Sequence, residues 1–222
     1  MPRAVIFDID GTLIDSVDAH AAAWVDTFRH FGLGVPHAAV RAQIGKGGDL
    51  LMPVFLDADR IAREGEEIEA YRGDLFKRDY LPRVRPFPGV RELFERLRAE
   101  GKVLVLASSA KEDELERYAR LAQVDTLIDA ATSSSDAEHS KPYPDIVRAA
   151  VERAGVAPEE AMMVGDTPYD AEAARGAGVR AIGVLCGGWP EEALREAGCA
   201  AVYRDPADLL ARLDPSPLAG QG

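Results

Sequence analysis

The sequence of 222 residues has few of the features that would place it in a membrane or on nucleic acid. Its apolar runs are far shorter than the roughly 20 residues that a membrane-spanning helix needs. It has 26 lysines and arginines against 38 aspartates and glutamates, a formal charge of −12, and no basic run. Nucleic acid and anionic membranes would be repelled at long range, so we predict neither as a main partner.

Cysteine is also scarce. Cys186 and Cys199 are the only two, and neither has a CxxC or Cys/His ligand spacing. A chain of this size can form a core without disulfides, so we interpret both as small buried apolar residues. No apolar segment typical of a signal peptide precedes the first strand-like run, so we expect a cytoplasmic protein.

Short apolar runs alternate with helical patterns through most of the chain. Continuous hydrophobicity over four or five residues is typical of strands that are covered on both faces. The strand candidates are 4–7, 103–106, 161–164, 181–185 and, more weakly, 200–203. Helices with one apolar face are predicted over 89–100 and 144–154, each followed by a glycine. This alternation predicts an α/β fold with a Rossmann-like parallel sheet flanked by helices.

Residues 15–85 break this alternation, because they show helical patterns and no convincing strand. One helix is predicted to begin near Ser16 and another to cover about 59–79. The proline-rich stretch 81–88 is interpreted as a return linker, since prolines disfavour helices and central strands. The predicted organisation is a core domain of residues 1–14 and 86–222, an all-helical insertion of residues 15–85, and a flexible tail of residues 215–222.

Polar residues follow three of the predicted strands. Asp8-Ile9-Asp10-Gly11 follows the first, Ser108-Ser109 the second and Gly165-Asp166 the third, with Asp170 four residues further on. Two carboxylates two residues apart at a strand's end project to the same side, and the carboxyl ends of neighbouring parallel strands converge on one crevice. Each motif alone could be an ordinary turn or helix cap. Their shared position in the sheet favours one common site.

A lysine is predicted to join these carboxylates. Lys141 lies in a loop that prolines hold open before the helix at 144–154, which would present it to the site rather than to solvent. Three carboxylates suit Mg²⁺, which commonly bridges carboxylates to a substrate phosphate. The nucleotide-binding GxxxxGK[ST] loop is missing, because the glycines around Lys46 have a different spacing. The combination indicates phosphoryl chemistry.

Together these elements resemble the haloacid dehalogenase superfamily over nearly the whole chain. The first motif of that family is similar to Asp8-Ile9-Asp10-Gly11-Thr12-Leu13, the second to Ser108, the third to Lys141 and the fourth to Gly165-Asp166 through Asp170. The resemblance implies that the helical insertion is a cap over the crevice and that the chain is a Mg²⁺-dependent phosphomonoesterase. Within the family, the chain is similar to phosphoglycolate-phosphatase-like and small sugar-phosphate phosphatases.

The resemblance also implies a role for each motif residue. Asp8 would be the nucleophile that forms an aspartyl-phosphate, and Asp10 the general acid and base. Ser108 and Lys141 would hold the phosphoryl oxygens. The implied metal ligands are Asp8, the backbone carbonyl of Asp10, Asp166 and Asp170, the last as a ligand or as the partner of one. Further candidates for substrate binding are Ser109, Lys46 and His20.

Other functions stay open at this point. The family's dehalogenases lack the second aspartate of the first motif, so Asp10 argues against dehalogenation. A sugar-phosphate mutase resembling β-phosphoglucomutase is favoured by His20 and Trp24 in the first cap helix. It is disfavoured by Gly165, where the mutase has the glutamate of a Glu-Asp pair. A catalytically silent regulatory or binding module is disfavoured by the complete set of catalytic residues. We expect a monomer or homodimer.

Overall fold

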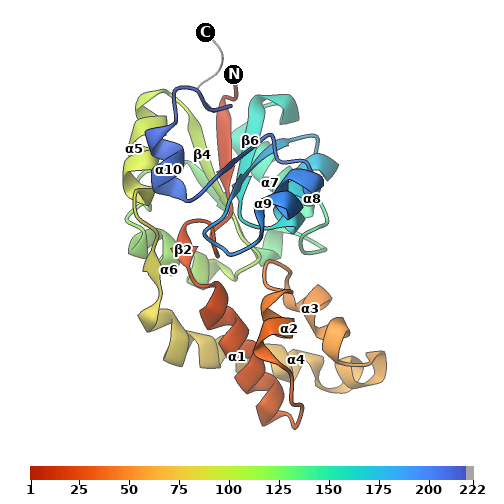
Figure 1. Cartoon of the computed structure of the whole chain (residues 1–222). Coiled ribbons are helices and arrows are strands. Elements are labelled where there is room, and N and C mark those ends of the chain that lie inside the picture. The colour runs from red at the N-terminus through yellow and green to blue at the C-terminus, as the bar shows by residue number, and fades with distance from the viewer. Residues whose placement is uncertain (219–222) are drawn as a thin grey trace. The chain divides into compact units, whose positions relative to one another are not determined.

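The apolar runs predicted as strands pair into one six-stranded parallel sheet in the computed structural model, which describes residues 1–218. The strand order is β5-β4-β1-β6-β7-β8, so the first strand of the chain lies inside the sheet (Figure 1). The strands are β1 Ala4–Phe7, β4 Val103–Ala107, β5 Ala130–Thr132, β6 Ala161–Gly165, β7 Arg180–Val184 and β8 Ala201–Tyr203. Every residue of β1 is buried, as expected for a strand covered on both faces. The α/β fold with a Rossmann-like sheet is therefore confirmed.

Helices cover both faces of this sheet. Figure 1 shows α5, α6 and α10 on one face and α7, α8 and α9 on the other. Their bounds are α5 Val90–Ala99, α6 Glu112–Leu121, α7 Asp145–Ala154, α8 Pro168–Gly176, α9 Glu191–Ala197 and α10 Pro206–Ala211. The helix at α7 ends at Gly155 with φ of 65°, a left-handed conformation that favours glycine. No helix in residues 1–218 is both long and apolar enough to cross a bilayer.

Two findings about strands differ from the sequence-based expectation. The strand β5 was not predicted, because its Ala-Ala-Thr sequence is short and only its last residue is fully buried. Two further strands, β2 Ile14–Asp15 and β3 Arg85–Pro86, pair with each other outside the main sheet. This antiparallel pair brings together the two points at which the chain leaves and re-enters the α/β part of the molecule.

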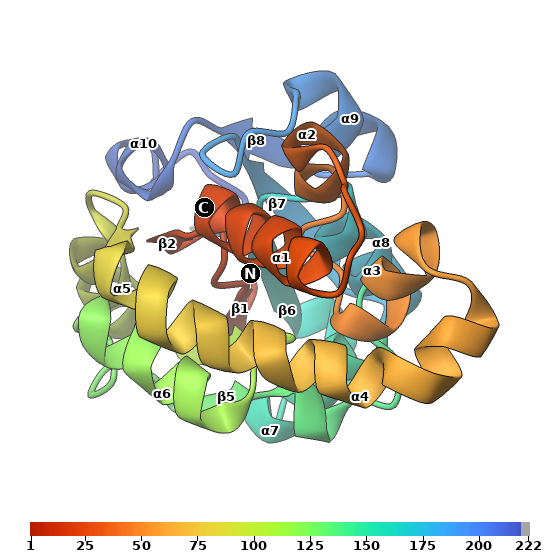
Figure 2. The same cartoon turned by 90° about the horizontal axis from the view of Figure 1, so that it is seen from below.

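The chain divides into two compact units. An α/β unit contains Met1–Asp15 and the chain from Arg85 onward, and a helical unit contains Ser16–Val84. The helices of the second unit are α1 Val17–His30, α2 His37–Arg41, α3 Gly48–Phe55 and α4 Ala58–Leu75, followed by a π-helical turn Phe76–Tyr80 and a 3₁₀ turn Leu81–Arg83. Figure 2 shows α1 next to α4, which it contacts. Trp24 and Phe28 of α1 and Ile68 of α4 are buried in one apolar cluster, so their helical spacing defines the core of this unit.

The tail expected over residues 215–222 lies partly outside the described residues. Within the described part, Ser216 and Leu218 are buried. The Leu218 N–H donates to Ser216 Oγ (3.2 Å), and the Ser216 N–H donates to the Leu213 carbonyl (2.8 Å). The chain is thus packed and hydrogen-bonded up to residue 218.

Candidate active site

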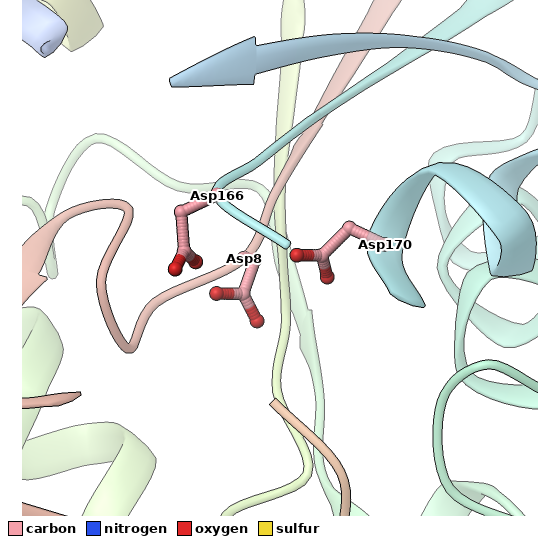
Figure 3. Close-up of side chains that lie close together, drawn as sticks. All are labelled: Asp8, Asp166 and Asp170. Carbon is pink, nitrogen blue, oxygen red and sulfur yellow. The ribbon is translucent and has the colours of Figure 1, made fainter. Parts of the chain in front are cut away.

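Four charged side chains meet at the carboxyl ends of β1 and β6. Asp8 follows β1, Asp166 follows β6 and Asp170 lies in the first turn of α8, with their carboxylates turned toward one another (Figure 3). One oxygen from each carboxylate lies within 4.8 Å of the other two. Lys141, in the loop before α7, contacts two of the three. All four side chains are buried, so the structure brings together the candidates from the first, third and fourth motifs.

The loop after β1 directs a hydroxyl group into this cluster. It turns at Gly11, whose φ of 84° is a left-handed value that favours glycine. The Thr12 N–H then donates to the Ile9 carbonyl (3.2 Å). As a result, Thr12 Oγ1 lies 3.2 Å from Asp8 Oδ2 and 3.0 Å from Asp166 Oδ1. One hydroxyl proton cannot fully satisfy both, so Thr12 links the two carboxylates without neutralising either.

Lys141 is the cation at the centre of the cluster. Its Nζ donates to Asp8 Oδ1 and to Asp170 Oδ1, the latter at 2.7 Å. Burial alone would lower the pKa of Lys141, but the charges of Asp170 and Asp8 outweigh it and raise that pKa above its usual value. Lys141 is therefore charged throughout the physiological pH range.

The three carboxylates carry more negative charge than Lys141 can balance. Burial raises the pKa of Asp8 to about 7, although the charge of Lys141 opposes this shift. Burial also raises the pKa of Asp166 well above its usual range, and repulsion from Asp8 and Asp170 adds to the effect. Because a buried carboxylate is costly to ionise without compensation, the cluster needs either protons or an added cation near neutral pH.

Asp166 and Asp170 differ in how their oxygens are used. Asp170 Oδ2 accepts hydrogen bonds from the Thr167 N–H (3.0 Å) and hydroxyl (2.7 Å), while its Oδ1 accepts from Lys141. Asp166 Oδ2 is buried and has no hydrogen-bond donor within residues 1–218. The oxygen with spare capacity to bind a ligand thus belongs to Asp166. An all-oxygen donor set of this kind fits a hard divalent cation.

Two glycines allow the backbone to approach these carboxylates. A Cβ added at Gly187, in the loop after β7, would overlap the Asp166 carboxylate, and one added at Gly165 would lie 2.5 Å from Asp170 Cβ. The same loop is held by Cys186, whose Sγ donates to the Gly11 carbonyl (3.1 Å). The segment after β7 therefore packs against the residues that follow β1 and β6.

We expect Gly187→Ala to destabilise the protein. The added methyl group must displace Asp166 or the loop, and overpacking of this kind costs about 1–3 kcal/mol in the free energy of unfolding. Chemical denaturation followed by circular dichroism measures the change. Gly73→Ala in α4 is the control, because a Cβ there would meet no atom within 4 Å. That variant should be neutral or more stable by up to about 1 kcal/mol, since alanine favours helix. Equal stability of Gly187→Ala and the wild type would contradict the packing described.

The remaining candidates in the α/β unit are Asp10, Ser108 and Ser109. They also lie near strand ends, and they differ in burial and in their backbone or side-chain contacts. Asp10 is half-buried, and its backbone forms a bridge with Ile14. Ser108 is buried after β4, and its Oγ accepts the Ala110 N–H (3.1 Å). Ser109 is half-buried. The Ser108 hydroxyl therefore stabilises a turn, and it can still donate its own proton.

Two candidates belong to the helical unit. The Lys46 Nζ donates to Gln43 Oε1 (2.7 Å) in the connection between α2 and α3. His20, on α1, is buried and stacks on Phe76 with ring centroids 4.0 Å apart. Each thus has at least one contact inside its own unit.

Three residues that shape the cluster have no role predicted from the sequence. Thr167 could have been found, because Thr167-Pro168-Tyr169-Asp170 matches a capping box, and the structure shows its reciprocal hydrogen bonds. Thr12 had only its place in the same loop as a signal. Gly187 had no local signal, because its close approach to Asp166 depends on tertiary packing.

Comparisons with known proteins give a consistent result. Residues 5–184 match the model of a family described as haloacid dehalogenase-like hydrolase. A phosphoglycolate phosphatase of Rhodospirillum rubrum is 30% identical over 218 residues, which cover 94% of this chain and 90% of that protein. Pyrophosphatase PpaX of Bacillus velezensis is 31% identical over 185 residues, 82% of each chain. The structure of a hydrolase from Pseudomonas syringae aligns with a TM-score of 0.88 at 28% identity and covers 96% of this chain and 98% of that one.

Proposed function

We propose a specific reaction for this chain on the premise that it belongs to the haloacid dehalogenase-like hydrolase family. The resemblance seen in the sequence is thus confirmed, and the chain is a phosphoric ester hydrolase. The proposed reaction is the Mg²⁺-dependent hydrolysis of a small phosphorylated metabolite, a sugar phosphate or a phosphoglycolate-like compound, through an aspartyl-phosphate. The supporting observation is that buried Asp8 contacts both Lys141 and Thr12 and lies beside Asp166.

Asp8 is the proposed nucleophile. One of its carboxylate oxygens attacks phosphorus, the Asp8–phosphorus bond forms, and the bond from phosphorus to the ester oxygen breaks. The contact with Lys141 favours the ionised form of Asp8 and offsets the charge that develops on the phosphoryl oxygens. Ser108 is the proposed second contact to those oxygens.

Asp10 is the proposed general acid and base. It first gives its proton to the departing ester oxygen, so that an alcohol leaves. It then takes a proton from the water that attacks phosphorus in the aspartyl-phosphate. The Asp8–phosphorus bond breaks, inorganic phosphate leaves, and both carboxyl groups return to their starting states.

Mg²⁺ is the proposed cofactor. The carboxylates of Asp8 and Asp166 and the Asp10 backbone carbonyl are its proposed ligands, because Asp166 Oδ2 is buried without a donor. When bound, Mg²⁺ would supply positive charge that stabilises the negative phosphoryl group. Both oxygens of Asp170 already accept hydrogen bonds, so we propose that Asp170 acts by positioning Lys141.

Stabilisation of the protein by Mg²⁺ should grow with pH. Burial raises the pKa of Asp8 from its ordinary value of 3.8 to about 7 in the folded protein, so between these values Asp8 holds more proton in the metal-free folded state than in the unfolded chain. Its stability therefore falls as the pH rises through that window. Mg²⁺ binds ionised carboxylates, so the increase in Tm that it causes should be larger at about pH 8 than at about pH 5. Thermal melts with and without Mg²⁺ at constant ionic strength measure this difference.

Two variants provide the controls. Asp166→Asn should lose most of the Mg²⁺-dependent increase in Tm, because it removes the proposed ligand. Asp125→Asn changes an exposed aspartate of the same unit and should keep the increase. A Mg²⁺ effect in the wild type that is the same at both pH values would contradict the proposal.

A sugar-phosphate mutase is the second candidate function. His20 and Trp24, which favour it by resemblance, are both buried in α1. Against it, a glutamate side chain at the position of Gly165 would overlap Asp170. A hexose 1-phosphate distinguishes the two reactions when it is given to the enzyme with Mg²⁺. Free phosphate as the product supports hydrolysis, and the hexose 6-phosphate supports the mutase.

The general test is a screen of phosphorylated metabolites with Mg²⁺ that compares the wild type with Asp8→Asn. We expect the wild type to release phosphate from at least one compound and the variant from none. Failure of the wild type to hydrolyse any of them, a generic aryl phosphate included, would contradict the proposal and favour a silent binding module.

A further inference from the structure

The loop before α7 carries Lys141 into the buried carboxylate cluster with little regular structure to hold it. Residues 137–144 contain no helix or strand, and His139 is exposed. Lys141 itself is 2% exposed. Pro142 and Pro144 have no N–H to donate, so the backbone of this loop can form few hydrogen bonds of its own. The position of the ammonium group therefore depends on the side chains that hold the loop.

Asp145, the first residue of α7, closes the loop. Its Oδ2 accepts a hydrogen bond from the His139 N–H (3.0 Å) and lies 3.3 Å from His139 Nδ1. Burial alone would raise the pKa of Asp145, but the contacts with His139 outweigh it and lower that pKa, so the carboxylate is charged at neutral pH. A charged acceptor strengthens such a hydrogen bond. One carboxylate thus joins the two ends of a loop that has Lys141 between them.

The end of the loop at Asp145 is anchored on the secondary structure that carries the cluster. The next residue, Ile146, is buried in the core of the α/β unit. Helix α7 contacts both β1 and α8, the elements next to the two carboxylates that Lys141 contacts. A Cβ added at Gly176, in the last turn of α8, would lie 3.2 Å from Pro144 Cβ, so the loop also packs against that helix. Asp145 therefore has a fixed backbone position from which its carboxylate can hold the other end of the loop.

We propose that Asp145 is a positioning residue for phosphoryl transfer. By accepting from the His139 N–H, it keeps the Lys141 ammonium group in contact with its two carboxylates. The inference rests on the proposed function, in which Lys141 stabilises the phosphoryl oxygens. A displacement of about 1 Å in a catalytic group can lower a rate about 100-fold, so the closure of this loop should be visible in turnover.

A carboxylate in the first turn of a helix can also act in a simpler way. It interacts favourably with the helix N-terminus, which would stabilise α7 without any effect on Lys141. That effect needs the negative charge of Asp145, whereas closure of the loop needs an oxygen that accepts the His139 N–H. Asp145→Asn removes the charge and keeps an acceptor oxygen, so it distinguishes the two roles.

The test is the hydrolysis of p-nitrophenyl phosphate with saturating Mg²⁺. Asp145→Ala should lower kcat by about 10- to 50-fold and change KM by less than about threefold, because Lys141 acts on charge that develops in the transition state. Asp145→Asn should keep kcat within about threefold of the wild type. Glu152→Ala, at an exposed position of the same helix, is the matched control and should keep the wild-type kcat.

A double-mutant cycle shows whether Asp145 acts through Lys141. In the Lys141→Met background there is no ammonium group to place, so Asp145→Ala should lower kcat for each folded molecule by less than about twofold more. A role in stability alone would lower kcat by the same factor in both backgrounds. Circular dichroism verifies folding. If Asp145→Ala does not fold, Asp145→Glu decides, because its carboxylate is displaced by one methylene and kcat should fall about fivefold.

Chemical labelling measures the position of Lys141 without turnover. An amine-reactive ester acylates lysine Nζ atoms, and mass spectrometry of the peptides compares buried Lys141 with exposed Lys111 of the same molecule. Asp145→Ala should raise the relative rate at Lys141 by at least about tenfold, the scale of losing a hydrogen bond to a charged group. Asp145→Asn and Glu152→Ala should leave it near the wild-type value.

The outcomes separate this proposal from the proposed function. Wild-type kcat in Asp145→Ala or, where that variant does not fold, in Asp145→Glu overturns the positioning role and leaves the phosphatase intact. An equal loss of kcat with and without Lys141, or a loss in Asp145→Asn as large as in Asp145→Ala, does the same. Absence of phosphate release by the wild type counts against the proposed function instead. The labelling then decides the placement of Lys141 by Asp145, and an unchanged relative rate in Asp145→Ala overturns it.

Discussion

Asp8→Asn is expected to lower turnover by about 10⁴- to 10⁶-fold, the scale of loss when a catalytic nucleophile is removed. An amide cannot attack phosphorus in place of a carboxylate. Phosphate release from the best substrate of the screen, measured with excess enzyme, provides the readout. Mg²⁺ binding should be weaker but measurable, because Asp166 still supplies a buried oxygen.

A matched control distinguishes the effect of losing the nucleophile from the effect of losing one negative charge elsewhere in the protein. Asp125→Asn makes the same chemical change at an exposed position of the α/β unit and should retain wild-type turnover. Near-normal phosphate release by Asp8→Asn, with the protein folded, would remove Asp8 from the mechanism.

Lys141→Met should have the second largest effect, because it acts on both activity and stability. Turnover should fall by about 10²- to 10³-fold, the cost of removing one charged contact to a developing anion. The substitution also leaves Asp8 and Asp170 buried without their cation. Breaking a buried ion pair by removing one partner costs about 3–5 kcal/mol. The loss should be smaller at about pH 5 than at about pH 8, because protonated carboxyl groups need no cation.

Lys102→Met is the control for Lys141→Met. Lys102 is also buried, and its Nζ donates to the Pro2 carbonyl (2.8 Å). Lys102 lies just before β4, at the opposite end of that strand from Ser108. This variant should lose stability and keep its turnover for each folded molecule. Unfolding experiments at the two pH values, together with phosphate release, distinguish the two lysines. Equal losses of turnover in both variants would mean that Lys141 contributes to folding alone.

The sheet could be predicted from the sequence because its central strands have a strong local signal. β1, β4, β6 and β7 are continuous apolar runs, and a strand that is buried on both faces leaves little room for other residue types. β5 could not be predicted, because two alanines and a threonine have no distinctive pattern. Its pairing with β4 is decided by tertiary contacts.

The helices show the same dependence on local signals. α5 and α7 were predicted because each has one apolar face and is followed closely by a glycine. The short helices α9 and α10 have seven and six residues, which give too few turns for a periodic pattern to be recognised. Their positions are set by packing and by local caps such as Asp205, whose side chain accepts the Asp208 N–H.

For the candidate site, the sequence predicted that four charged residues would lie together: Asp8, Lys141, Asp166 and Asp170. Which of their oxygens accept hydrogen bonds could be learned only from the structure. Asp8 and Asp166 end neighbouring parallel strands, so their proximity follows from the strand order. That Asp170 has both oxygens occupied while Asp166 keeps one oxygen without a donor depends on side-chain geometry.

The covalent step is tested most directly by rapid acid quenching of the enzyme during turnover, followed by mass spectrometry of the peptide that contains both Asp8 and Asp10. We predict a phosphoryl group on Asp8 that forms faster than steady-state turnover, disappears as substrate is used up, and is never seen in Asp8→Asn. Phosphate release with the phosphoryl group on another residue, or with no phosphorylated enzyme at any time point under single-turnover conditions, would contradict it.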